Sequence, residues 1–82
     1  MKKTKKIRLG QYFRQLRHES ALTVPVILSQ VKISPTYLHA IERNERSPRI
    51  DKLQRLLQIY NITSVDLKNN VIASDLKYFF LE

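Results

Sequence analysis

Apolar residues recur at helical spacing near the start of the chain. Leu9, Phe13 and Leu16 fall at positions i, i+4 and i+7, which lie on one face of an α-helix. The polar residues between them face away from this stripe. The pattern therefore predicts an amphipathic helix that begins at Ile7 or Leu9 and ends at Glu19.

Two start signals predict a pair of short helices in the middle of the chain. Thr23 is a favourable N-cap, and Pro25 fits a first helical turn, where its missing N–H is not needed. The dipeptide Ser34-Pro35 gives the same signal again. One helix is therefore expected to end at Val31, and the next, after a tight turn, at about residues 43–44.

The later part of the chain predicts two more helices and a short extra segment. Its most regular apolar stripe consists of Ile50, Leu53, Leu56, Leu57 and Tyr60. Thr63 and Asp66 have the spacing of a capping box, which predicts a short helix through Leu67. The apolar segment 71–82 fits either a sixth helix or, at Tyr78–Leu81, a short strand. The predicted fold class is therefore all-α, with five helices and a C-terminal segment that is helix or strand.

Composition restricts the classes of function. The 82 residues suffice for one small domain, and 43% apolar residues suffice for a core. Without cysteine the chain has neither disulfides nor cysteine zinc sites, and its single glycine excludes a glycine-rich phosphate loop. The 15 Lys and Arg against 7 Asp and Glu give a formal net charge of +8. Because cationic proteins release counterions from polyanions, this charge favours nucleic acid as the partner.

The sequence gives little support to catalysis, metal binding or membrane insertion. His18 and His39 have no second His or Cys at metal-ligand spacing, and no nucleophile with an adjacent base is evident. No segment approaches the roughly 20 apolar residues of a membrane span, and the residues after the basic start are too polar for a signal peptide. We therefore expect a cytoplasmic protein that is not an enzyme and has no catalytic residues, cofactor, metal site or membrane partner.

Positive charge is concentrated at the start of the chain. The basic residues of this segment are Lys2, Lys3, Lys5, Lys6 and Arg8. Like charges at this density do not pack by themselves, so residues 1–8 are expected to form a flexible basic arm.

Residues 22–44, with two short helices joined by a tight turn, resemble the Cro/phage-repressor (XRE-type) helix-turn-helix family. The further motifs that carry the resemblance are Leu9-Gly10, Phe13-Arg14 and Leu16-Arg17 in the first helix and the run Glu42 to Pro48 after the third. The resemblance spans residues 9–67 without a gap. It implies a five-helix, lambda-repressor-like DNA-binding domain over this range, followed by an extension at 68–82.

The resemblance also implies which residues contact DNA. The third helix, about residues 35–43, would lie in the major groove. The implied base contacts are Pro35, Thr36, Tyr37, His39 and Ala40, and the expected phosphate contacts are Thr23, Lys32, Arg43, Arg46, Arg49 and Lys52. Few direct base contacts are expected, because no Gln, Asn or Arg stands at the first two positions to bind a base with two hydrogen bonds.

The chain departs from the family pattern at three places. Val24 replaces a Gln that binds phosphate, Leu28 replaces an Ala, and Lys32 replaces the turn Gly. Lys32 would therefore adopt a left-handed conformation at the cost of modest strain. The resemblance further implies a bidentate ion pair between Arg17 and Glu42 that fastens the first helix to the third. The alternative is that both are ordinary surface charges.

The resemblance implies a sequence-specific regulator of transcription that binds double-stranded DNA as a homodimeric repressor of a bacterium or mobile element. The alternative is a degenerate helix-turn-helix module that binds protein, as an antirepressor or antitoxin-like partner, with weak or non-specific DNA binding. The chain has no room for a ligand domain, so an effector would have to be another protein. We expect residues 68–82 to pack against their copy in the dimer, although folding back over their own domain is the alternative.

Overall fold

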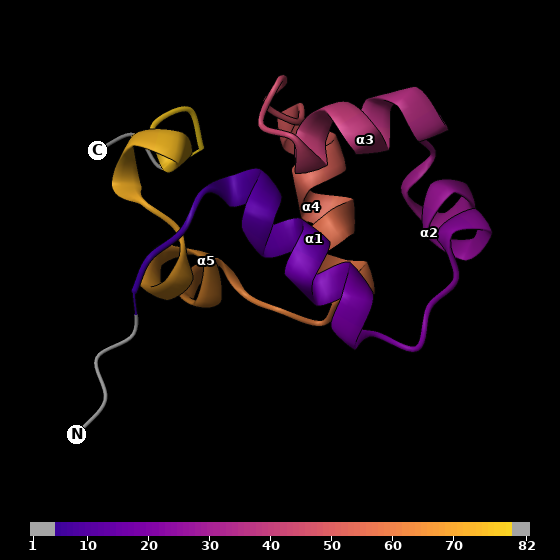
Figure 1. The fold of residues 1–82 in the computed structure, drawn as a ribbon, viewed down its shortest axis with the longest axis horizontal. Helices are drawn as coiled ribbons and strands as arrows, with labels where there is room; N and C mark the ends of the chain where they lie inside the picture. Colours follow the sequence, from indigo (N-terminus) through magenta and orange to yellow (C-terminus); the bar gives the residue numbers. More distant parts are fainter. Residues whose placement is uncertain (1–4, 80–82) are drawn as a thin grey trace.

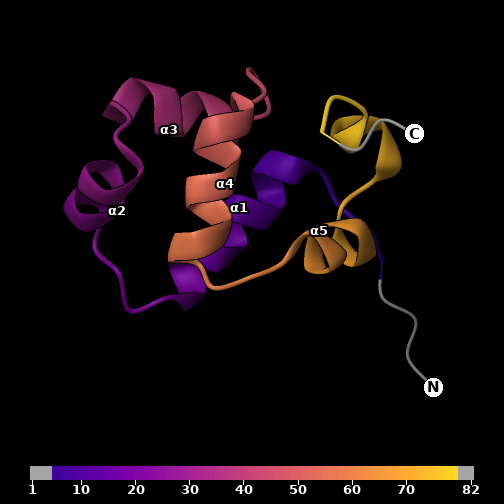
Figure 2. The ribbon, with the colours of Figure 1, turned by 180° about the vertical axis from the view of Figure 1, so that it is seen from behind.

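The computed structural model describes residues 5–79 and contains, within this range, five α-helices and no strand longer than a single bridge. The helices are α1 (Leu9–Glu19), α2 (Val24–Val31), α3 (Pro35–Glu42), α4 (Ile50–Ile59) and α5 (Ser64–Asn70), followed by a short 3₁₀ helix, η1 (Ala73–Leu76). The predicted all-α fold is confirmed. In Figure 1 and Figure 2, α1 and α4 cross near the middle, α2 lies at one end, and α5 with the C-terminal segment lies at the other.

The predicted helix starts in the middle of the chain are confirmed. The side-chain oxygens of Thr23 and Ser34 each accept a hydrogen bond from the backbone N–H three residues further on, at 3.4 and 3.1 Å. Lys32 has the left-handed backbone expected at the turn, with φ 63°. Asn44 ends α3 in the same conformation, with φ 62°. Asparagine adopts this conformation more readily than most residues, whereas for Lys32 it is strained.

The capping box of α5 is also confirmed, although the predicted end of that helix was wrong. The Thr63 hydroxyl accepts a bond from the Asp66 N–H at 3.2 Å, and the Asp66 carboxylate accepts one from the Thr63 N–H at 2.8 Å. The helix continues past Leu67 to Asn70, whose side-chain amide donates to the Asp66 carbonyl oxygen at 2.8 Å.

The core lies where the apolar stripes of the helices meet. Its fully buried side chains are Phe13, Ile27, Val31, Leu38, Ile41, Leu53, Leu56, Leu67 and Val71. Phe13 packs beside Tyr60, with ring centroids 6.2 Å apart. Ile50, which was expected in the stripe of α4, is 52% exposed because it is the first residue of that helix and lies outside the packed turns.

The C-terminal segment packs on its own domain. Val71 and Leu76 are buried in the core, and Phe79 is half-buried against it. Only four residues form η1, and Tyr78 and Phe79 lie in turns, so neither the sixth α-helix nor the strand at 78–79 is present. The expectation for residues 80–81 lies outside the described residues. The alternative, in which the segment folds back over its own domain, thus holds for Val71, Leu76 and Phe79. A contact of the segment with a second copy stays a prediction.

Ile7 binds this segment through its backbone, as an isolated parallel bridge to Val71. Its N–H donates to the Asn70 carbonyl oxygen, and its own carbonyl oxygen accepts a bond from the Ile72 N–H, both at 2.9 Å. The bridge holds residues 71–72 extended, and it prevents α5 and the tail from forming one continuous helix. Ile7 therefore does not belong to the flexible arm that was predicted at residues 1–8.

Asp75 caps the start of α1 from the other end of the chain. Its carboxylate accepts hydrogen bonds from the Leu9 N–H and from Arg8 Nε, both at 2.9 Å. Partial burial raises the pKa of Asp75, but these bonds and the charge of Arg8 outweigh it and hold the pKa below its ordinary value. Arg8 is thus paired, Lys5 and Lys6 are exposed, and Lys2 and Lys3 lie outside the described residues.

Candidate nucleic-acid interface

The candidate interface is built on the contact between α1 and α3, which approach each other closely at Gly10. A Cβ atom at this position would lie 2.8 Å from Asn44 Oδ1 and would overlap the carbonyl oxygen of Ile41. The Gly10 N–H donates a hydrogen bond to Asn44 Oδ1 at 2.8 Å. Asn44 therefore ends α3 and satisfies an N–H in the first turn of α1 at the same time.

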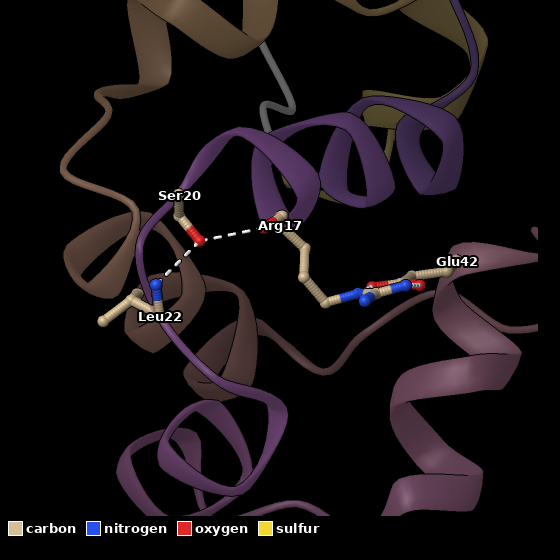
Figure 3. A network of polar contacts seen from close by, with 4 residues as sticks. All are labelled: Arg17, Ser20, Leu22 and Glu42. Carbon is tan, nitrogen blue, oxygen red and sulfur yellow. Dashed lines mark hydrogen bonds and ion pairs between the residues drawn. The ribbon is translucent and has the colours of Figure 1, made fainter.

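A bidentate ion pair joins the same two helices (Figure 3). Arg17 Nε donates to Glu42 Oε2 at 2.7 Å, and Arg17 Nη2 donates to Glu42 Oε1 at 2.9 Å. The side chains are 20% and 5% exposed, respectively. The hydrogen bond to Glu42 raises the pKa of Arg17. Burial, and to a smaller extent the charge of Glu42, raises the pKa of Tyr60 to about 12. The structure thus brings Arg17 and Glu42 together in a mostly buried site.

The end of α1 beside this pair is fixed by Ser20. Its hydroxyl donates to the Arg17 carbonyl oxygen at 2.9 Å and accepts a bond from the Leu22 N–H at 3.3 Å (Figure 3). These bonds stop the helix and direct the chain toward α2. The backbone that carries the Arg17 side chain is therefore well defined.

The outer face of α3 carries the side chains that the resemblance assigned to bases. Pro35, Thr36 and His39 are exposed, Ala40 is half-exposed, and Leu38 and Ile41 face the core. Proline and alanine offer no hydrogen bond from their side chains, so among these four residues only Thr36 and His39 present donors or acceptors.

Tyr37 lies at the side of α3 rather than on its outer face. Its hydroxyl accepts a hydrogen bond from the Arg49 N–H at 3.0 Å, and the Arg46 guanidinium lies 4.6 Å from the centre of its ring. This half-buried side chain joins α3 to the loop before α4. The hydroxyl accepts this bond from the N-cap residue of α4 and keeps its own hydrogen to donate, so the expected base contact of Tyr37 stays a prediction.

Most of the residues expected to contact phosphates are exposed. Arg43, Arg46 and Arg49 are exposed, as are Thr23 at the start of α2 and Lys32 at its end. Two of the arginines have acidic neighbours, but Arg43–Glu45 and Arg49–Asp51 are both 3.7 Å apart and well exposed, so they hold the side chains weakly.

Lys52 has a contact that sequence reasoning did not show. Its Nζ donates to the Lys32 carbonyl oxygen at 3.0 Å, at the strained end of α2. The bond ties α4 to the turn between α2 and α3. Lys52 therefore stabilises the turn, and its ammonium group lies at the backbone of Lys32.

A groove of about 210 Å³ separates α1 from the outer face of α3. It is lined by Arg14, Arg17, His39, Glu42 and Arg43. Arg14 belongs to the first-helix motif, but the sequence predicted no contact with DNA for it. Its spacing from Arg17, three residues apart on one helix, is the signal that would have placed both side chains on the same face.

The described residues 5–79 contain no cluster of three or more His, Cys, Asp or Glu that could bind a metal ion. His18 lies at the end of α1, whereas His39 lies on α3. Within the same range, the helices are too short and too polar to cross a membrane.

Comparison with known proteins agrees with this geometry. Residues 8–69 match the family model of a helix-turn-helix domain, a range that begins just before α1 and ends within α5. Over 65 residues the chain is 35% identical to the HTH-type transcriptional regulator DdrOP3 of Deinococcus deserti. The aligned part covers 79% of this chain and 50% of that relative. The chain thus spans about half the length of the curated relative that it matches.

Proposed function

The chain belongs to the XRE-type helix-turn-helix family, and on this basis we propose that it regulates transcription by binding double-stranded DNA with α3 in the major groove. The observation that carries this proposal is the outer face of α3, which exposes Thr36 and His39 beside three exposed arginines. The ion pair between Arg17 of α1 and Glu42 of α3 joins α3 to α1 at the side of this face. Cations around a helix of this kind are suited to phosphates at the borders of the groove.

We further propose that the protein is a homodimeric repressor. A two-fold symmetric DNA site requires two recognition helices about one helical turn of DNA apart, which a dimer supplies. Because Val71 and Leu76 are buried in their own domain, the contact between subunits would use other residues. The 81% exposed Tyr78 is one apolar side chain of the C-terminal segment that remains available for it.

Binding to duplex DNA is expected to weaken steeply as salt rises. Phosphate contacts should supply most of the affinity, because the face of α3 has few base-reading groups, and each neutralised phosphate adds roughly −0.9 to the log–log slope. Fluorescence anisotropy with random and genome-derived duplexes at several salt concentrations measures the slope, and the end point gives the number of chains per duplex. A Lys5→Gln/Lys6→Gln variant should flatten the slope on every duplex if the arm contacts phosphates.

The absence of measurable duplex binding at low salt would contradict the proposed function. A protein-interaction module of the same fold would then be the better account. Binding with a steep slope but with equal affinity for all duplexes would instead leave a DNA-binding protein without sequence specificity.

Thr36→Ala and His39→Ala are each expected to weaken binding to the preferred site by roughly 1–3 kcal/mol, the range for a base-reading contact. The loss on random DNA should be much smaller, because both residues are proposed to contact bases. The preferred site is first obtained by selection from a random duplex library, and each variant is then titrated against both kinds of DNA. Equal losses on the two would show that Thr36 and His39 only position or fold the helix.

A further inference from the structure

The outer face of α3 has two different sides. Tyr37 and Glu42 are five positions apart, which at 3.6 residues per turn separates them by about 140° on the buried side of α3 and by about 220° on its exposed side. On the Tyr37 side, the chain packs against the loop before α4, through the Arg49 N–H. On the Glu42 side, it packs against α1, through Arg17. The residues exposed on this wider side are Pro35, Thr36, His39 and Arg43.

A helix in the major groove has a sugar–phosphate backbone on each side, because the groove is only about 12 Å wide. The loop before α4 presents the exposed Arg46 and Arg49 to one backbone. The α1 side, which faces the other backbone, has the groove of about 210 Å³ lined by Arg14, Arg17, His39, Glu42 and Arg43. No phosphate contact from α1 was expected from the sequence.

The charges in this groove favour an anion. Arg17 neutralises Glu42 through two short hydrogen bonds, so the buried carboxylate does not repel an incoming phosphate. Arg14 is exposed and makes no ion pair with any residue of the described range 5–79. Among the described residues, the ion pair of Arg43 is its weak 3.7 Å contact with Glu45. Two guanidinium groups thus remain to bind an anion at the entrance of the groove.

We propose that the groove between α1 and α3 binds a phosphodiester of the DNA backbone, with Arg14 and Arg43 as its ligands. This proposal rests on the proposed function, because a backbone reaches the groove only when α3 lies in the major groove. A guanidinium can donate two parallel hydrogen bonds to a phosphate, which suits the site to arginine. The contact carries no base information, so it contributes to affinity on every sequence.

Arg14→Gln tests the site. With a random duplex and with the preferred one, the log–log salt slope should become less steep by about 0.9, the value for one phosphate contact. A fourfold rise in salt would then weaken DNA binding by Arg14→Gln about 3.5-fold less than it weakens DNA binding by the wild type. Affinity at low salt should fall by the same factor on both duplexes. Because Arg14 is exposed, the thermal unfolding midpoint of Arg14→Gln should equal that of the wild type.

Arg55→Gln is the matched control. It removes the same charge from an exposed position of α4, in a different groove that Gln30 and Gln58 also line. It should change the slope less than Arg14→Gln does. Arg14→Lys, which keeps the charge, should retain most of the slope. If the wild type binds with a steep slope and the slope of Arg14→Gln equals that of the wild type or of Arg55→Gln, the site is disproved while the proposed function stands. A wild type that does not bind duplex DNA disproves both.

A second measurement locates the phosphate. Neutral methylphosphonates replace the phosphates of the preferred duplex one at a time, and each duplex is titrated with the wild type and with Arg14→Gln. At one position, beside the half-site on the α1 side, the substitution should weaken the wild type but leave Arg14→Gln almost unchanged, because the two changes remove the same contact. If every substitution weakens both proteins equally, Arg14 contacts no single phosphate and the proposal is wrong.

Discussion

Arg17→Met is expected to lower the free energy of unfolding by about 3–5 kcal/mol, a large share of the stability of a small domain. The Glu42 carboxylate, which is only 5% exposed, would lose both hydrogen bonds that Arg17 donates to it. Methionine keeps most of the apolar length of arginine, so the loss would report the missing guanidinium rather than missing packing. Urea unfolding followed by circular dichroism measures the difference between variant and wild type.

The double variant Arg17→Met/Glu42→Leu is the control for this result. It removes both charges, and an apolar pair of similar volume needs no partner, so it should recover most of the lost stability. If Arg17→Met alone costs less than about 1 kcal/mol, the pair contributes no more than an exposed surface pair does. The position of α3 would then depend on its apolar packing and on the Gly10 contact.

The helix starts in the middle of the chain could be predicted because their determinants are local. Thr23 and Ser34 each bind an N–H only three residues away, and the capping box of Thr63 and Asp66 spans the same distance. The left-handed conformation of Lys32 follows from these helix starts, since one residue must turn the chain between two adjacent helices. Periodicity likewise separated the buried from the exposed side of each long helix.

Contacts between distant segments could not be predicted in this way. Asp75 caps α1 through the Leu9 N–H, 66 positions away, and no local pattern around either residue indicates it. The Tyr37 hydroxyl binds the Arg49 N–H across a loop, which the spacing on α3 does not show. The candidate contacts to DNA came from the family resemblance, and Arg14 was absent from them because its groove exists only once α1 lies against α3.

Gly10→Ala is expected to destabilise the protein by about 3 kcal/mol, the upper part of the range for overpacking a well-packed site. The new Cβ atom would overlap the Ile41 carbonyl oxygen and lie 2.9 Å from the carbonyl carbon of Glu42. These are backbone atoms of α3, so no side chain can rotate to make room. α1 and α3 would have to separate, which would lengthen the Gly10–Asn44 hydrogen bond and displace the outer face of α3.

Helix propensity alone gives the opposite sign, and this makes the substitution decisive. Alanine is favoured over glycine in a helix by about 1 kcal/mol, so Gly10→Ala would stabilise α1 if nothing lay against it. Gln11→Ala, at an exposed position of the same turn, is the matched control and should leave stability within about 0.5 kcal/mol of the wild type. Urea unfolding of the three proteins separates the cases. A more stable Gly10→Ala would mean that α1 and α3 do not touch at Gly10, and the groove beside them would then have a different shape.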